Sequence, residues 1–180
     1  SGNVLLAQQT EMFEESFASF AGARYGVAVS SGGSALQLSL AALGIGEGDE
    51  VIVPAMTAVP TASAVCAVGA RPVIVDINDE TAAIDFDQVE SAMTERTRAV
   101  IVVHLYGRPV ANIERLMNLG GKVVEDCTQS YGATRGLTGS VGAYSFYPTK
   151  NLGGIGDGGM VVTDDPDVVD RVRRLRVHGQ

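Results

Sequence analysis

Residues 51–76 read VIVPAMTAVPTASAVCAVGARPVIVD, and the fold prediction starts from this stretch. Two short β-branched runs, residues 51–53 and 72–76, enclose a longer segment that is rich in small apolar residues. The segment Thr57–Val68 is expected to be a helix, with Thr57 as its cap and Pro60 tolerated in its first turn. Neither run alternates apolar with polar residues, which is typical of strands buried on both faces of a parallel sheet. The stretch therefore predicts a strand, a helix and a second strand parallel to the first.

The same alternation of strands and helices extends over the rest of the chain. Further helices are expected at residues 10–20, 35–43, 86–93, 113–119 and 165–177, and further strands at 25–29, 99–103, 122–124, 143–147 and 159–163. Apolar strands that alternate with helices indicate a mostly parallel sheet covered by helices on both faces. The predicted fold class is therefore α/β, a three-layer sandwich with a mostly parallel central sheet.

Small and polar residues follow several of the predicted strands: Ser31–Ser34, Pro54–Thr57, Asp76, His104 and Asp126. In a parallel sheet the carboxyl ends of the strands meet at one edge, and α/β proteins bind their ligands there. Ser31–Ser34 also precedes a predicted helix, whose free N–H groups and positive end suit a phosphate. An ordinary strand-to-helix turn has the same composition, so this loop alone does not decide between the two explanations.

Composition narrows the class of protein. The chain has 180 residues and 46% hydrophobic residues, which is typical of a globular domain. A formal charge of −8 and a pI near 4.7 argue against nucleic acid or an anionic membrane as a partner. No apolar run reaches membrane-spanning length, and no signal peptide is recognisable. Cys66 and Cys127 lie among apolar residues without metal-ligand spacing, so we expect reduced core thiols in a cytoplasmic protein.

The predicted helix at residues 165–177 carries acidic residues near its start and an arginine cluster toward its end: Arg171, Arg173, Arg174 and Arg176. This order of charges complements the helix dipole. An anion site would also contain such a cluster, but a solvated helix end is the expected explanation.

A lysine lies in a glycine-rich loop in the last third of the chain. Residues 142–159 read GAYSFYPTKNLGGIGDGG, and Lys150 follows a short aromatic strand. The chain has only two lysines, Lys122 and Lys150, against eleven arginines. A lysine amine can form a Schiff base with a carbonyl, and desolvation makes the amine nucleophilic. On spacing alone, an ordinary loop lysine between two strands explains the stretch equally well.

Three features are expected to meet at one sheet edge: the phosphate loop Ser31–Ser34, Asp126 at the end of a buried strand, and Lys150. Pyridoxal phosphate (PLP) has a phosphate, a ring nitrogen that must stay protonated and an aldehyde that can be tethered. A buried aspartate holds the ring proton by charge pairing. The lysine forms an aldimine, is displaced by the amino donor and then moves a proton. The combination predicts a PLP-dependent enzyme with Lys150 and Asp126 as catalytic residues.

Six motifs resemble those of the DegT/DnrJ-type PLP-dependent sugar aminotransferases, which have the aspartate-aminotransferase-like fold. They are SGGSAL (31–36), GIGEGDEVIVP (44–54), HLYG (104–107), EDCTQSYGA (125–133), SFYPTKNLG (145–153) and GDGG (156–159). The motifs span nearly the whole chain, and the lysine block and the Glu-Asp block are distinctive. The resemblance implies a fold type I transferase in which residues 1–180 form the PLP-binding large domain, without the C-terminal small domain.

The resemblance also implies a set of cofactor-binding residues: Gly33, Ser34, Asp126, Gln129, Ser145 and Lys150. Lys150 would carry the aldimine, and Asp126 would pair with the ring nitrogen. Gln129 would hydrogen-bond the ring hydroxyl oxygen. Ser145 would join the backbone of Gly33–Ser34 on the phosphate.

The chain departs from the family pattern at two positions. Gly33 replaces the usual threonine, which removes one hydroxyl from the phosphate site. Ala58 replaces the usual aromatic residue that stacks on the cofactor, unless Met56 or another side chain covers the ring. Losing a stack costs about 1 kcal/mol, so cofactor affinity is expected to fall without loss of activity. His104 is expected to support the end of its strand rather than to react.

The activity implied by the resemblance is transfer of an amino group from glutamate or glutamine to a keto-sugar, typically nucleotide-linked, by a homodimer with shared active sites. A cyclitol ketone as acceptor would leave the same sequence pattern. Two alternatives stay open: a non-catalytic, regulatory module with this fold, and a related PLP-dependent sugar dehydratase. The dehydratase has histidine in place of the tethering lysine, which Lys150 contradicts. A nicotinamide-binding Rossmann domain fits worse, because no GxGxxG motif follows the first strand.

Overall fold

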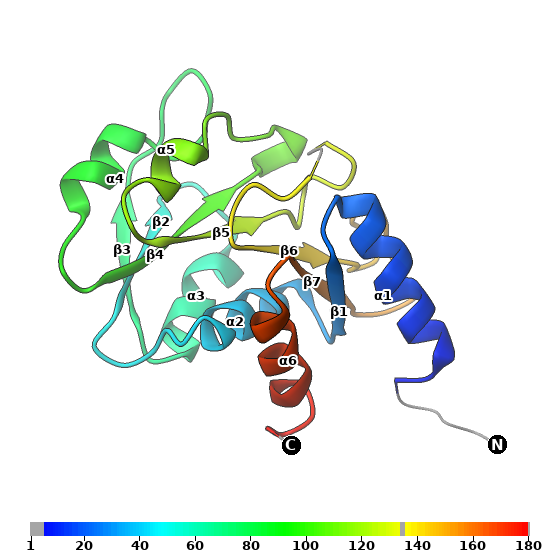
Figure 1. The fold of residues 1–180 in the computed structure, drawn as a ribbon. Helices are drawn as coiled ribbons and strands as arrows, with labels where there is room; N and C mark the ends of the chain where they lie inside the picture. Colours follow the sequence, from blue (N-terminus) through cyan, green and yellow to red (C-terminus); the bar gives the residue numbers. More distant parts are fainter. Residues whose placement is uncertain (1–5, 134–135, 180) are drawn as a thin grey trace.

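The computed structural model in Figure 1 describes residues 6–133 and 136–179. Its strands are β1 (Tyr25–Val29), β2 (Glu50–Pro54), β3 (Arg71–Val75), β4 (Thr97–Val103), β5 (Lys122–Asp126), β6 (Val141–Ser145) and β7 (Gly159–Thr163). Its helices are α1 (Gln8–Ala21), α2 (Gly32–Ala42), α3 (Val59–Ala67), α4 (Phe86–Ala92), α5 (Glu114–Met117) and α6 (Pro166–Leu175), with a 3-10 turn η1 at Leu105–Gly107. Within these two ranges, no helix combines the length and apolar character needed to cross a membrane.

The described strands form one seven-stranded sheet in the order β1-β7-β6-β5-β4-β2-β3. β7 is antiparallel to both of its neighbours, and every other neighbouring pair is parallel. Six strands therefore point the same way, and their carboxyl ends share one edge with the start of β7. The register aligns Val103 with Asp126 and Asp126 with Ala143. The predicted mostly parallel sheet is confirmed.

Helices cover both faces of the sheet, as Figure 1 shows. Val51 and Val53 of β2 belong to a core that α2, α3 and α6 complete. Ile52, which points the opposite way between them, belongs to a second core with α4 and α5. On that second face, Phe17 of α1 packs edge-on against Tyr144 of β6. Because side chains alternate along a strand, successive residues of an apolar run pack into the cores on the two opposite faces of the sheet. The predicted three-layer arrangement is confirmed.

Three of the predicted element boundaries are wrong near the sheet edge. Thr57 does not cap α3: the N-cap is Ala58, and the Thr57 hydroxyl instead bonds the Thr61 hydroxyl at 2.7 Å. The strand predicted at 143–147 ends at Ser145, where its pairing with β7 stops. α2 begins earlier than predicted, at Gly32, because the Ser31 side chain accepts the Ser34 N–H and caps the helix.

One prediction about side-chain surroundings is also wrong, and another is incomplete. Cys127 is buried, but Cys66 is exposed, because it lies on the side of α3 that faces away from the sheet. The arginine cluster at the end of α6 is solvated as predicted at Arg171, Arg173 and Arg174, which are exposed, while Arg176 is half-buried. Arg171 donates to the Ala42 carbonyl at 3.0 Å, and Arg176 ion-pairs with the buried carboxylate of Glu14. These arginines fasten α6 to its neighbours, which the charge pattern alone did not reveal.

Candidate active site

The N-terminus of α2 forms the predicted phosphate loop. The Ser31 side-chain oxygen accepts the Ser34 N–H at 3.0 Å, and the Ser31 carbonyl accepts the Ala35 N–H at 2.9 Å. The N–H groups of Gly32 and Gly33 come before these bonds, at helix positions that have no intrahelical acceptor. Together with the positive end of the helix, they form an anion-binding surface at the carboxyl end of β1.

Gly32 brings this loop against the ends of two neighbouring strands. A Cβ atom at Gly32 would lie 2.7 Å from Cβ of Ser145 and 3.0 Å from Cγ2 of Thr128. Only a glycine permits such an approach, and it joins the loop to Ser145 at the end of β6. Gly33 is different, since a Cβ there would meet only Pro60 and Ser31 at 3.7 and 3.8 Å. The site thus has room for a Cβ atom at Gly33, the first atom of the threonine that the family usually carries.

Asp126 ends β5 with a buried carboxylate, 3% exposed. Oδ2 accepts a hydrogen bond from Thr61 Oγ1 at 2.9 Å, and Oδ1 accepts one from the Thr128 N–H at 3.1 Å. Because the Thr61 proton is given to Asp126, the Thr57 hydroxyl must donate to Thr61 in turn. Two linked hydroxyl groups, from Thr61 of α3 and from Thr57 just before this helix, therefore fix the orientation of this carboxylate.

Sequence reasoning missed Thr61 and Thr128 as supports of Asp126. The one available signal was a threonine within an otherwise small and apolar helix segment. Its partner lies 65 residues further along the chain, and no local pattern encodes that pairing.

Lys150 lies in a tightly folded loop that leaves β6 at the same sheet edge. Its backbone N–H donates to the Tyr147 carbonyl at 2.8 Å, and Gly154 N–H donates to the Phe146 carbonyl at 2.8 Å. A Cβ atom at Gly153 would collide with the Pro148 carbonyl, so this turn requires glycine. Lys150 is half-buried, and its amine makes no hydrogen bond or ion pair with the residues that the structure describes.

Gln129 lies three residues after Asp126 and is half-buried. Its side-chain Oε1 accepts the backbone N–H of Tyr106, in the turn that follows β4, at 3.0 Å. The two side chains considered for ring stacking, Met56 and Ala58, are both exposed at the carboxyl end of β2. The edge therefore gathers the phosphate loop, Ser145, Asp126 and Gln129, while the assignment of each to a cofactor stays a prediction.

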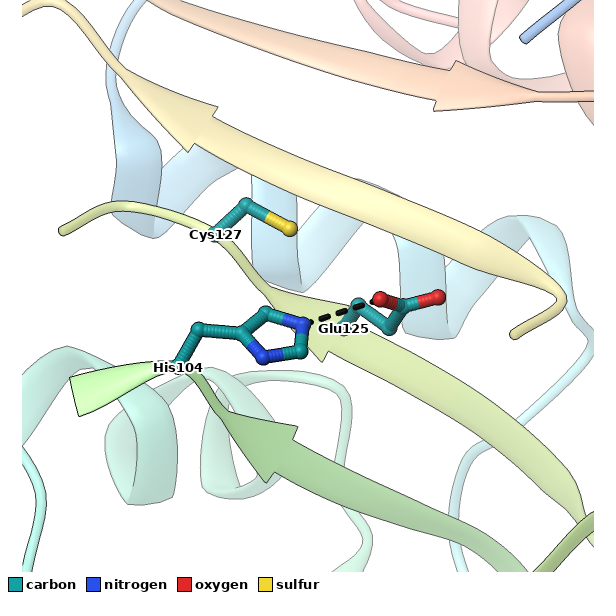
Figure 2. A group of neighbouring side chains, drawn as sticks. All are labelled: His104, Glu125 and Cys127. Atoms are coloured by element: carbon teal, nitrogen blue, oxygen red, sulfur yellow. Dashed lines mark hydrogen bonds and ion pairs between the residues drawn. The ribbon is translucent and has the colours of Figure 1, made fainter. Parts of the chain in front are cut away.

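Three buried side chains, His104, Glu125 and Cys127, lie beneath this edge with donor atoms within 4.8 Å of one another (Figure 2). His104 Nε2 and Glu125 Oε2 are 2.9 Å apart. The His104 ring is 1% exposed, in agreement with the predicted supporting role. Burial raises the pKa of the Cys127 thiol above its ordinary range, and the charge of Glu125 adds to the rise. The trio contains residue types that bind zinc, but a neutral thiol and a hydrogen-bonded His–Glu pair describe its chemistry.

The whole chain, residues 1–180, matches the model of the DegT/DnrJ/EryC1/StrS aminotransferase family. It is 45% identical to a dTDP-3-amino-3,4,6-trideoxy-alpha-D-glucose transaminase from Micromonospora megalomicea, over 99% of this chain and 50% of the relative. It is 47% identical to a UDP-N-acetyl-3-dehydro-alpha-D-glucosamine 3-aminotransferase from Acidithiobacillus ferrooxidans, over 97% of this chain and 50% of the relative. The crystal structure of S. venezuelae DesV in complex with a ketimine intermediate superposes with a TM-score of 0.95 at 46% identity.

That superposition covers 100% of this chain and 51% of DesV, so the chain spans about half the length of the relatives that it matches. The motifs, the sheet topology and these similarities agree over the full sequence. The chain belongs to the DegT/DnrJ/EryC1/StrS aminotransferase family.

Proposed function

We propose that the whole protein is a PLP-dependent aminotransferase that moves an amino group from glutamate or glutamine to a nucleotide-linked keto-sugar. The observation that carries the proposal is the buried Asp126 carboxylate, held by Thr61 and Thr128 at the sheet edge where the α2 phosphate loop begins. The two curated relatives, whose names specify dTDP- and UDP-linked sugars, support the acceptor class.

The donor set at this edge fits pyridoxal phosphate. The N–H groups of Gly32 and Gly33 and the hydroxyls of Ser34 and Ser145 suit a phosphate, whereas the Ser34 N–H expected to bind it is already donated to Ser31. The lack of a Cβ at Gly32 keeps the loop closely packed. Asp126 supplies a fixed negative charge, which a protonated ring nitrogen needs. The bound cofactor would supply a carbonyl that takes up the amino group and a ring that stabilises negative charge at the substrate carbon.

Each of the chain's own residues then has a defined task. Asp126 keeps a proton on the ring nitrogen by charge pairing, and the hydroxyl of Thr61 prevents that carboxylate from rotating away. Gln129 hydrogen-bonds the ring oxygen. Lys150 Nζ would hold the cofactor through its carbonyl, and the same amine would take up and release the proton that moves during transfer. The half-buried position of Lys150 supports these assignments, as does the lack of a hydrogen-bond or ion-pair partner for its amine among residues 6–133 and 136–179.

We also propose that residues 1–180 are the large, cofactor-binding domain of a cytoplasmic homodimer. Large apolar side chains are exposed on α1 and in the Lys150 loop: Met12, Phe13, Phe20, Tyr147 and Ile155. Such a surface is typical of one that another part of the protein or a partner subunit covers. The cytoplasmic location is supported by two cysteines that are both free.

The test is an absorbance spectrum of the complete protein with added PLP, for wild type, Lys150→Ala and the matched control Lys122→Ala. Lys122 is exposed at the start of β5 and is the one other lysine in the sequence. We expect a visible band in wild type and Lys122→Ala, its absence in Lys150→Ala, and bleaching by glutamate with formation of 2-oxoglutarate.

Each alternative predicts a different result. A non-catalytic module would give no lysine-dependent band, and the exposed Ala58 without an aromatic ring is the feature that favours it. A dehydratase would bind PLP without a covalent link to Lys150 and would not convert the keto-sugar into an amino sugar. Either result would refute the proposal.

A further inference from the structure

The buried His104 ring is hydrogen-bonded through both of its nitrogens. The Val110 N–H donates to Nδ1 at 3.0 Å, so Nδ1 carries no proton. The proton is therefore on Nε2, which donates to Glu125 at 2.9 Å (Figure 2). The other oxygen of Glu125 accepts two backbone N–H groups, from Thr138 and Gly139. This network fixes both the tautomer and the orientation of the ring.

The bond from Val110 closes a turn that starts at His104 itself. Between these ends, Tyr106 has φ of 54° and Gly107 has φ of 78°. A left-handed conformation is unfavourable for an aromatic residue, so the surrounding structure must enforce it. The Tyr106 side chain is 76% exposed and packing of its ring cannot supply that enforcement. We name residues 104–110 the histidine turn.

The histidine turn determines which end of the Gln129 amide faces the site. Tyr106 N–H donates to Gln129 Oε1 at 3.0 Å, so the oxygen of the amide is committed to the turn. The other end of the amide, its NH₂ group, can only donate. A donor is what an anionic ring oxygen requires, whereas the reversed amide would present an oxygen and repel it.

We propose that His104 is a positioning residue: by closing the histidine turn, it holds Tyr106 N–H against Gln129 and thereby directs the Gln129 NH₂ group toward the ring oxygen of the cofactor. This inference rests on the proposed function, because it assumes that PLP binds at this edge. The buried His104–Glu125 pair would thus act on the cofactor indirectly, because the turn that it holds orients the Gln129 amide.

A matched pair of substitutions separates the two bonds of the ring. His104→Asn keeps an acceptor close to the position of Nδ1, so it retains the bond to Val110 and loses the one to Glu125. His104→Gln reaches the position of Nε2, so it retains a donor to Glu125 and loses the acceptor for Val110. Each variant loses one buried hydrogen bond, and His104→Asn loses the one to the charged carboxylate, so it should be no more stable than His104→Gln. Only His104→Gln opens the turn, so an effect of the turn cannot be a mere loss of stability.

Two measurements on the complete protein test the proposal. The first is hydrogen exchange of the Tyr106 amide without PLP, which we expect to be about tenfold faster in His104→Gln than in His104→Asn. The second is the pH midpoint of the visible band with PLP. Loss of the donor leaves negative charge on the ring oxygen less stabilised, so its proton is held more tightly and the midpoint rises by about one pH unit.

Equal exchange rates and equal midpoints in the two variants would overturn the inference. If no lysine-dependent band forms in wild type, the proposed function has failed, and the exchange experiment still reports on the turn.

If the His104 variants do not fold, Gly107→Ala decides the question. It strains the turn at φ of 78° without touching the buried pair, and its new Cβ would lie 3.5 Å from the nearest atom, the Gln129 carbonyl oxygen. Gly120→Ala is the control, since Gly120 also has positive φ but is remote from the turn. Gly107→Ala should raise the midpoint and Gly120→Ala should not, and the same midpoint in both would refute the proposal.

Discussion

Replacing Thr61 by valine should destabilise the fold through one buried hydrogen bond. Thr61 is completely buried, and its hydroxyl donates to Asp126 at 2.9 Å. Valine has nearly the same shape, so packing is kept and only the hydroxyl is lost. A hydrogen bond to a charged group contributes about 1.5–3 kcal/mol, and water cannot replace a donor at a site with no exposure. We therefore expect the free energy of unfolding to fall by about 2 kcal/mol.

Two control substitutions calibrate this number. Thr61→Ser keeps the hydroxyl and loses one buried methyl group, which costs about 1 kcal/mol. Thr57→Val removes the hydroxyl that donates to Thr61. Thr57 is half-exposed, so a water molecule can donate to Thr61 in its place, and the loss of stability should stay below about 1 kcal/mol. The expected order of destabilisation is Thr61→Val, then Thr61→Ser, then Thr57→Val.

The assay is urea unfolding of the complete protein without PLP, followed by far-ultraviolet circular dichroism, with PLP affinity measured separately by titration. We expect Thr61→Val to weaken PLP binding as well, because the Asp126 carboxylate loses the bond that orients it. If Thr61→Val costs no more than Thr57→Val, the Thr61–Asp126 bond does not contribute as argued, and the hydroxyl chain is not what holds the carboxylate.

Three further predictions concern the sheet edges. Gly159→Ala should destabilise the fold by more than about 3 kcal/mol, because its Cβ would collide with the Ser31 backbone; an unchanged melting temperature would contradict this. Gly33→Thr should increase PLP affinity about fivefold by adding a hydroxyl at a position where a Cβ makes only ordinary contacts, and weaker binding in a PLP titration would disprove it. Glu50 has a lowered pKa, chiefly through the hydrogen bond from Arg71, so its stabilising effect is present above its ordinary pKa and is lost as the pH falls through the lowered value. Glu50→Gln should therefore lose stability at pH 7 and show a shallower acid limb in urea titrations at successive pH values, whereas parallel curves would refute the assignment.

The sequence alone determined the layered architecture, because burial on two faces forces a strand to be apolar throughout. The runs at residues 51–53 and 99–103 show this, and both belong to strands that have a neighbour on each side in the sheet. The sheet edge that carries the site followed from the same pattern, since parallel strands end together. Asp126 and Lys150 stand out as candidates because a carboxylate after a buried strand and a lone lysine among glycines are unusual in composition, and their roles stay predictions.

Only the tertiary structure decided which side chains meet. The bond from Thr61 to Asp126, the approach of Gly32 to Ser145 and the pairing of His104 with Glu125 join residues from separate elements. Such partners depend on the register and order of the strands. A periodic pattern of apolar residues shows which face of an element is buried, but it does not show which other element packs against that face. Thr57 illustrates the limit. Its position in the sequence suits a helix cap, but its hydroxyl bonds the Thr61 hydroxyl, which in turn donates to the buried Asp126 carboxylate.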